Sequence, residues 1–360
     1  MSLRERIRGL LGFIRRTERS VRKYSRDPID HVVLVDGTMS VLDDGHETNI
    51  GLIYKLLSEV SGTANVGILY EAGNQWTDWS RTLDIIEGRG INRQIRRAYG
   101  WLATRYRPGD RIFLIGYSRG AYAVRSLAAV IDQIGLLTRE NATERMVREA
   151  YRHYQLDTNR EVCAAFAKSY CHPDTPVEAV AVFDTVKALG FRAPFVWKWE
   201  EVKHAFHSHH LGPSIRHGFH ALALDENREA FQPVLWECND DWDGHVEQVW
   251  FRGAHGDIGG QLTGFPPARP LCNIPLTWML SRLEACNLPL PDNWRSRFPT
   301  NVDAPWVGTL RGWGKYFLAR KKRVVGADPS EAIHSTAKDR AEKYGLPVAP
   351  SEVGSIVTAV

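Results

Sequence analysis

The sequence predicts an α/β fold in which a mostly parallel central sheet is covered by helices on both faces. Short β-branched or apolar runs alternate along the chain with longer segments of helical periodicity. The 360 residues are 43% apolar and 24% charged, which excludes a disordered or fibrous chain. The expected strands are 31–35, 66–70, 111–116, 177–183 and 248–252, and the expected helices are 49–60, 91–106, 119–136, 140–170 and 274–286.

The strands are recognised by their composition and by the turns that end them. The first, 31–35, is a β-branched run followed by an Asp-Gly-Thr turn, and 177–183 is apolar except for Glu178. Such runs are typical of parallel strands that are buried on both faces. Pro108-Gly109-Asp110 separates a helical segment from the apolar strand that follows it. Segment 71–90 is rich in Gly, Asn, Asp and Trp, and we expect it to form a surface loop.

Basic residues are concentrated at the amino terminus. Residues 1–26 carry a net charge of +7, so the rest of the chain carries −3. The apolar residues of this arm follow one face of a helix: Leu3, Ile7, Leu10, Ile14 and Val21. Two interpretations stay open, namely a helix lying on an anionic membrane surface and a helix packed on the body with its arginines in water. The mildly acidic body gives no reason to expect nucleic-acid binding.

The segment 111–136 carries the strongest chemical signal. Gly116-Tyr117-Ser118-Arg119-Gly120 has the form G-x-S-x-G, and an apolar strand precedes it while a helix of small residues follows. This strand–elbow–helix context predicts the nucleophile turn of an α/β-hydrolase, with Ser118 lifted above the sheet. The alternative is a serine in an ordinary glycine-rich turn.

A serine nucleophile needs a base and an acid that orients the base. Asp184 directly follows the strand 177–183, and His255 follows the strand 248–252 within a glycine-rich segment. Because the carboxyl ends of parallel strands meet at one edge, both are expected near Ser118. Asp257 is the rival acid, which would otherwise cap the turn after His255.

A developing oxyanion needs donors from the nucleophile turn and from an earlier loop. We expect these to be the backbone amides of Arg119 and Thr38. Gly37 lets the backbone of the earlier loop approach closely, and Asp36 is interpreted as a structural residue that holds this loop.

Segment 191–215 combines aromatic residues with histidines. A lid or interfacial patch and a plain packed loop are equally compatible with it. A metal site is the least favoured reading, because no carboxylate stands at a defined spacing from the histidines.

Several further blocks extend the pattern. In chain order they are Val35-Asp36-Gly37-Thr38, Pro108-Gly109-Asp110, Gly116-Tyr117-Ser118-Arg119-Gly120-Ala121-Tyr122, Phe183-Asp184-Thr185-Val186, His220-Ala221-Leu222-Ala223-Leu224-Asp225-Glu226 and Gly253-Ala254-His255-Gly256-Asp257-Ile258-Gly259-Gly260. Together they resemble the α/β-hydrolase family that contains the phospholipase effectors of bacterial type VI secretion, over about residues 30–345. The resemblance implies a serine lipase or phospholipase with Ser118, Asp184 and His255 as its triad.

The sequence therefore predicts hydrolysis of acyl esters of membrane lipids through an acyl-Ser118 intermediate, without cofactor or metal. The alternatives are a soluble carboxylesterase or thioesterase and, from another class, an inactive membrane- or partner-binding protein on a hydrolase fold. The expected parts are a basic amphipathic arm at 1–27, a catalytic domain at 28–350 and a tail at 351–360. Five cysteines without a CxxC pair and the lack of a secretory signal predict a cytoplasmic protein, either peripheral at a membrane or exported without a cleavable signal peptide.

Overall fold

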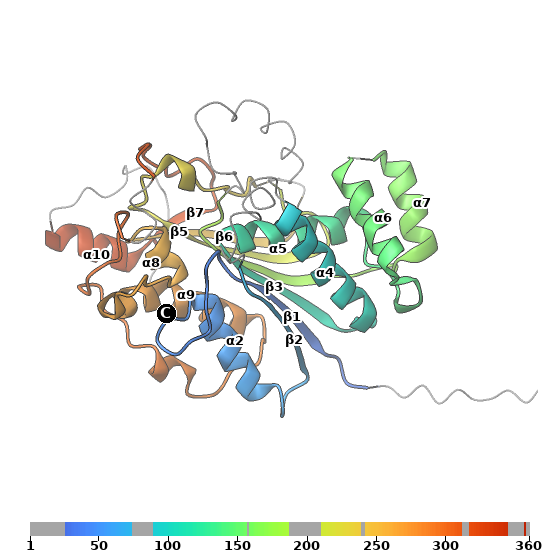
Figure 1. The fold of residues 1–360 in the computed structure, drawn as a ribbon, viewed down its shortest axis with the longest axis horizontal. Helices are drawn as coiled ribbons and strands as arrows, with labels where there is room; N and C mark the ends of the chain where they lie inside the picture. The colour runs from blue at the N-terminus through green and yellow to red at the C-terminus, as the bar shows by residue number, and fades with distance from the viewer. Residues whose placement is uncertain are drawn as a thin grey trace, which may run out of the picture.

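One parallel sheet organises the chain (Figure 1). The computed structural model describes residues 26–73, 89–156, 158–186, 210–238, 242–311, 317–344 and 356–357. Within these ranges the strand order is β2-β1-β3-β4-β5-β6-β7-β8, and every neighbouring pair is parallel. The strands are β1 Asp30–Val35, β2 Val66–Glu71, β3 Arg111–Tyr117, β4 Val177–Phe183, β5 Ile215–Ala223, β6 His245–Phe251, β7 Glu331–His334 and β8 Ile356–Val357.

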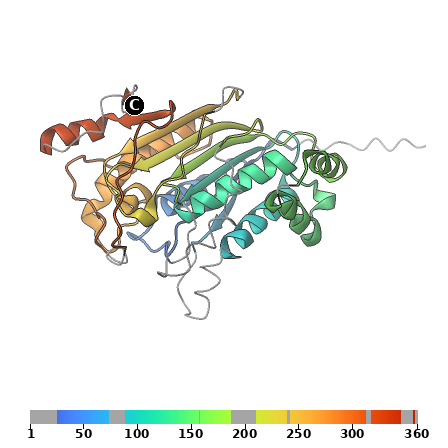
Figure 2. The same ribbon diagram turned by 90° about the horizontal axis from the view of Figure 1, so that it is seen from above.

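Helices cover both faces of the sheet. The longer described helices are α2 Asn49–Val60, α4 Arg89–Arg105, α5 Arg119–Ile134, α6 Glu144–Gln155, α7 Arg160–Tyr170, α9 Arg269–Ala285 and α10 Ser335–Tyr344, and the short α8 spans His255–Gly259. Figure 1 shows α2 and α9 on one side of the sheet and α4 and α5 on the other, and Figure 2 shows α5 lying along the strands.

The central strands are buried because their side chains enter two different cores. In β1, Val33 and Val35 pack into the core under α4 and α5, whereas Val32 and Leu34 pack into the core under α2 and α9. All four side chains are at most 2% exposed. This explains why the strand is a continuous apolar run instead of an alternating one, as expected for a parallel strand covered on both faces.

The strand order places the ends of four strands around one site. β1 pairs with β2 on one side and with β3 on the other, so the direction in which strands are added reverses beside β1. In open parallel sheets, ligands bind at the carboxyl edge beside such a reversal. The segments that follow β1, β3, β4 and β6 all leave from this edge.

The structure confirms the predicted fold class and corrects several elements. The helical segment expected at 140–170 is two helices, because Asn159 caps a new helix by accepting a hydrogen bond from the amide of Glu161 at 2.8 Å. β5, β7, β8 and α10 were not predicted. In β5, polar residues interrupt the apolar pattern: the exposed Arg216 pairs with Glu178 of the neighbouring strand β4 at 2.8 Å.

Some predictions concern residues outside the described ranges. They include nearly all of the arm at 1–27, most of the loop at 71–90, the aromatic segment up to residue 209 and most of the tail. The proposed boundaries at 27 and 350 therefore stay predictions. Within the part of the chain that the structure describes, no helix is both long enough and apolar enough to cross a membrane.

Candidate active site

A tight turn between β3 and α5 presents Ser118. The serine has a φ of 58° and a ψ of −121°, a strained conformation for a residue with a side chain. A Cβ added at Gly116 would lie 2.6 Å from the carbonyl oxygen of Gly120, and one added at Gly120 would lie 2.2 Å from the carbonyl oxygen of Val35. Both flanking glycines are therefore required, because the turn packs directly against its own helix and against the end of β1.

Three side chains from three strand ends meet at this edge. Ser118 Oγ lies 2.9 Å from His255 Nε2, and His255 Nδ1 lies 2.6 Å from Asp184 Oδ2. Ser118 is 7% exposed, His255 4% and Asp184 0%. Asp184 follows β4 with a φ of 40°, and His255 is the first residue of α8 after β6. The structure thus brings together the three residues that the sequence predicts as a triad.

The carboxylate of Asp184 accepts hydrogen bonds from other groups besides His255. Its Oδ1 accepts from the backbone amide of Ala223 at 2.9 Å. The guanidinium of Arg323 binds both carboxylate oxygens, at 2.5 Å to Oδ1 and 2.9 Å to Oδ2. Burial by itself raises the pKa of Asp184, but the charges and hydrogen bonds of Arg323 and His255 outweigh it and hold this pKa well below its usual value. The carboxyl group therefore stays ionised.

Arg323 is a site residue that the sequence reasoning missed. Its side chain is 1% exposed, and it also donates to the carbonyl oxygen of Ala223 at 2.8 Å and to that of Phe231. In the sequence it ends a basic run at 320–323, which looks like solvated surface. The available signal was indirect: a fully buried Asp184 requires a compensating donor from elsewhere in the chain.

Two aromatic rings and two backbone hydrogen bonds hold His255 in place. The ring of Tyr117 lies 4.9 Å from it and the ring of Phe231 lies 4.8 Å from it, measured between centroids. The Tyr117 hydroxyl donates to the backbone oxygen of His255 at 3.2 Å, and the His255 amide donates to Glu226 at 3.1 Å. Glu226 is itself buried and paired with Arg228 at 2.5 Å. The histidine therefore has little freedom to turn away from Ser118.

Asp257 occupies a different position from Asp184. Its carboxylate accepts from the backbone amides of Ala254 at 2.8 Å, Val307 at 2.6 Å and Gly308 at 3.2 Å. Burial raises its pKa, and these backbone hydrogen bonds oppose the rise. The geometry gives Asp257 the task of joining two loops, whereas Asp184 contacts the imidazole of His255.

The loop after β1 lies beside the nucleophile turn. Asp36 accepts from the Gly37 amide at 2.6 Å, from Thr48 Oγ1 at 2.8 Å and from the Tyr70 hydroxyl at 2.8 Å. Burial raises the pKa of Asp36 to about 6 despite these donors. This placement agrees with a structural task for Asp36 in holding the loop.

Thr38 connects this loop to the turn that carries Ser118. The side chain of Arg119 donates from Nε to Thr38 Oγ1 at 2.7 Å, and Gln261 donates to the Thr38 carbonyl at 3.0 Å. A Cβ added at Gly37 would lie 2.5 Å from the ring of Tyr117, so only glycine permits this close approach. The expected task of the Thr38 and Arg119 amides in binding an oxyanion stays a prediction.

His220 supports the backbone next to Asp184. It is fully buried in β5, and its Nε2 accepts from the Thr185 amide at 3.1 Å while Nδ1 lies 3.4 Å from Gln248 Oε1. Burial lowers the pKa of His220 to about 3, so it is neutral at pH 7. A neutral ring with its proton on Nδ1 satisfies both contacts.

The histidines of the aromatic segment do not enter this site within the described residues. Three of them precede residue 210 and lie outside the described ranges, and His210 Nδ1 lies 3.0 Å from the carbonyl oxygen of Glu237. Across the part of the chain that is described, no group of three or more His, Cys, Asp or Glu side chains is placed to hold a metal ion.

Comparison with known proteins identifies relatives of this chain. The family "T6SS, phospholipase effector Tle1-like, catalytic domain" matches residues 30–282. The uncharacterized protein YEL023C of Saccharomyces cerevisiae is 26% identical over 165 residues, which are 43% of this chain and 23% of the relative. This chain thus spans less than a quarter of the length of that curated relative.

Two solved structures show a partial likeness. The structure of the Tle1 effector bound to the VgrG spike of the type 6 secretion system has 18% identity and a TM-score of 0.37, with 66% of this chain and 52% of that chain covered. An uncharacterized protein from Pseudomonas aeruginosa has 14% identity and a TM-score of 0.42, with 76% of this chain and 49% of that chain covered.

The parallel sheet and its strand–elbow–helix unit define an α/β-hydrolase-like domain. Within this class, the chain belongs to the family of Tle1-like phospholipase effector catalytic domains, which matches more than half of its length. The matched range includes Ser118, Asp184 and His255 but ends before Arg323. The family resemblance seen in the sequence is thereby confirmed.

The two acids are distinguished by paired substitutions. Asp184→Asn is expected to lower the rate of ester hydrolysis by ~10³-fold or more, because the orienting carboxylate sets the histidine tautomer. Asp257→Asn is expected to lower it less and chiefly to reduce the melting temperature, because it weakens the acceptors of three amides. Rates are measured on a short-chain p-nitrophenyl ester at a temperature where circular dichroism shows both variants folded. The opposite order of rate losses would make Asp257 the orienting acid.

His220 predicts a specific pH dependence of stability. Its pKa is lower in the folded state than the value of about 6.5 expected for the unfolded chain, so its contribution is complete above that pH and is lost as pH falls toward 3. His220→Gln keeps an acceptor for the Thr185 amide but does not titrate. As the pH is lowered from 6 to 4.5, the unmodified protein is expected to lose more free energy of unfolding than the variant. The difference between the two slopes is expected to be about 1.4 kcal/mol per pH unit.

Denaturant unfolding at several pH values measures this difference, and contributions from Asp36 and the other histidines cancel in the comparison. Equal slopes for the two proteins would show that His220 is not a buried neutral group.

Proposed function

We propose that this protein is a serine hydrolase that cleaves an acyl ester of a phospholipid through an acyl-enzyme on Ser118. The observation that carries the proposal is the continuous hydrogen-bonded path from Ser118 Oγ through both nitrogens of His255 to Asp184. Its burial and its position at the carboxyl edge of the sheet support the same conclusion. Membership in a phospholipase effector family supports a lipid ester as the substrate class.

The geometry suggests a reaction in two halves. In the first, His255 Nε2 takes the proton of Ser118 as Oγ attacks the ester carbonyl, and Asp184 stabilises the imidazolium that forms. The amides of Arg119 and Thr38 are proposed to bind the resulting oxyanion. His255 then gives the proton to the departing alcohol, which leaves an acyl group on Ser118. In the second half, water activated by His255 releases the fatty acid and restores the serine.

Arg119 supports a substrate that carries a phosphate. Its guanidinium donates to Thr38 Oγ1 beside the nucleophile turn, and no carboxylate of the described residues pairs with it. Burial lowers the pKa of Arg119 to about 10, so the group stays charged at pH 7. A half-buried cation next to the reacting serine offers favourable binding for the phosphodiester of a phospholipid.

The nucleophile is tested with a matched pair of serine variants. Ser118→Ala is expected to abolish release of fatty acid from mixed phospholipid vesicles, because removing a triad member costs several orders of magnitude in rate. Ser126→Ala is the control, since it lies in the same helix and donates to the Tyr122 carbonyl instead of facing His255. Products are identified by mass spectrometry. More than about a tenth of the original rate in Ser118→Ala would refute the assignment.

The same assay separates the substrate classes. Release of fatty acid and a lysophospholipid supports a phospholipase, whereas activity on p-nitrophenyl esters alone supports a carboxylesterase. Activity on neither substrate favours a binding protein on a hydrolase fold.

We also propose that the basic arm brings the protein to an anionic membrane surface, where it would act as a peripheral protein. Arg26 belongs to the body, because it pairs with Asp110 at 2.5 Å, so the arm is taken as residues 1–25. Attraction of about 1 kcal/mol per basic residue near such a surface, with insertion of the apolar stripe, would give reversible binding.

Deletion of residues 1–25 is expected to reduce co-sedimentation with anionic vesicles and hydrolysis of their lipids, and high salt should reproduce part of this loss. Hydrolysis of a monomeric p-nitrophenyl ester should remain unchanged, because the triad lies in the body. Loss of that activity as well would show that the arm packs on the body. If the shortened protein binds vesicles as well as the full chain does, a surface other than the arm contacts the membrane.

A further inference from the structure

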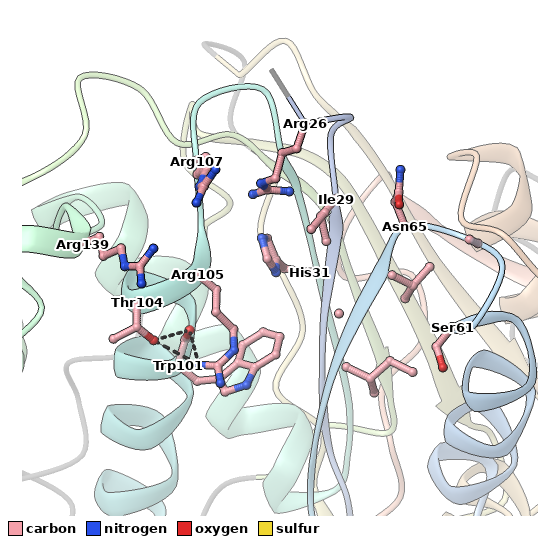
Figure 3. Close-up of a pocket in the computed structure, with 14 residues that line it drawn as sticks. Arg26, Ile29, His31, Ser61, Asn65, Trp101, Thr104, Arg105, Arg107 and Arg139 are labelled. Carbon is pink, nitrogen blue, oxygen red and sulfur yellow. Dashed lines mark hydrogen bonds between the residues drawn. The ribbon is translucent and has the colours of Figure 1, made fainter. Parts of the chain in front are cut away.

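A cavity of about 820 Å³ opens at the amino edge of the sheet, away from Ser118 (Figure 3). The starts of β1 and β2, the end of α4 and the turn that follows α4 form its wall. Its lining includes four arginines, a histidine and a tryptophan, which are Arg26, Arg105, Arg107, Arg139, His31 and Trp101. Among the described residues that line it there is no aspartate or glutamate.

Three of these arginines form no ion pair with a described carboxylate. Arg26 pairs with Asp110, but Arg105, Arg107 and Arg139 have no carboxylate within 4 Å among the residues that the structure describes. Arg105 lies over the ring of Trp101 at 4.9 Å and donates to Thr104 Oγ1 at 3.0 Å. These arginines are exposed at the rim, where their guanidinium groups are available to an anion.

The floor of the cavity has a hollow at Gly67, where no side chain projects. A Cβ at Gly67 would lie 3.3 Å from His31 Nδ1 and 3.6 Å from the ring of Trp101, so a larger side chain would fill this hollow. His31 stands opposite Gly67 in the pairing of β1 with β2. The hollow is therefore bordered by an imidazole nitrogen on one side and by an indole ring on the other.

His31 contributes an unused hydrogen-bonding atom. The side chain is buried, with 2% of its surface exposed, and its Nε2 lies 2.9 Å from Asp110 Oδ2. With Nε2–H donating to this carboxylate, Nδ1 is an acceptor, and no described residue donates to it. A buried polar atom without a partner is rare and marks a position where a donor is missing.

We propose that this cavity binds a phosphate-bearing molecule. Arg105, Arg107 and Arg139 would hold the phosphate oxygens with charge-assisted hydrogen bonds, and Trp101 would contact the less polar part of the ligand. The volume falls within the range of about 300–1,000 Å³ that is usual for small-molecule sites.

The cavity is separate from the hydrolytic site. β1 runs from the cavity at Asp30 to the nucleophile edge at Val35, and its five steps of about 3.3 Å each amount to roughly 17 Å. A ligand here would consequently not compete for Ser118. The phosphate has two possible sources, a free phosphorylated molecule and the headgroup of a lipid in a membrane, and both fit the same chemistry.

The test measures phosphate binding to the full chain and to two double variants. Arg105→Gln/Arg107→Gln removes two rim charges, and Arg148→Gln/Arg152→Gln removes two exposed arginines of α6 as the matched control. Calorimetry with glycerol 3-phosphate probes a free ligand. Co-sedimentation with phosphatidylglycerol–phosphatidylcholine vesicles, at constant ionic strength, probes a headgroup. Hydrolysis of a p-nitrophenyl ester verifies that each variant is folded.

The rim variant is expected to bind at least tenfold more weakly than the control variant to one or both probes, with unchanged ester hydrolysis. Weaker binding of glycerol 3-phosphate assigns a free ligand, and weaker binding of vesicles alone assigns a headgroup. Gly67→Val, which fills the hollow, should weaken binding of the same probe without removing charge. Equal binding by rim and control variants, or no binding of either probe by the unmodified chain, would overturn the proposal.

Discussion

The ion pair between Asp184 and Arg323 is the interaction on which the site depends. A carboxylate with no exposed surface is very costly to bury unless it is paired and hydrogen-bonded. Arg323 supplies the opposite charge, and the amide of Ala223 supplies a further donor from the neighbouring strand. The second oxygen of Asp184 remains directed at His255. One buried charge thereby joins β4, β5, α8 and the segment before β7.

Close backbone contact is the second constraint, and it acts through glycines at the same edge of the sheet. Gly120 lets the first turn of α5 touch the end of β1, and a Cβ at Gly259 would lie 2.1 Å from the ring of Tyr117. Tyr117 in turn lies against the imidazole of His255. The separation between serine and histidine is therefore set by packing of main chain against side chain, which a larger residue at either glycine would disturb.

Local patterns in the sequence were sufficient for five of the eight described strands and for the three aligned side chains. The strands β1, β3 and β4 each contain an apolar run. Asp184 directly follows β4, and His255 follows β6 after three intervening residues. Because both strands run parallel to β3, the two side chains are expected at the same edge as Ser118. β5 was not recognised because Arg216, His217 and His220 break its apolar pattern. Their partners lie in distant segments. Arg323 is 139 residues from Asp184 in the sequence, so no local pattern indicates that the two side chains meet.

A parallel sheet has two chemically different edges, and here they point in opposite directions. The proposed hydrolytic groups lie where the strands finish, whereas the arginine-rimmed cavity and Arg26 lie where they start. A bilayer bound flat against the starting edge would therefore face away from Ser118. In that orientation the serine would be presented to a second, apposed bilayer or to lipid that has already left the first. The direction of the strands thus places the proposed phosphate-binding surface and the proposed hydrolytic site at opposite edges of the sheet.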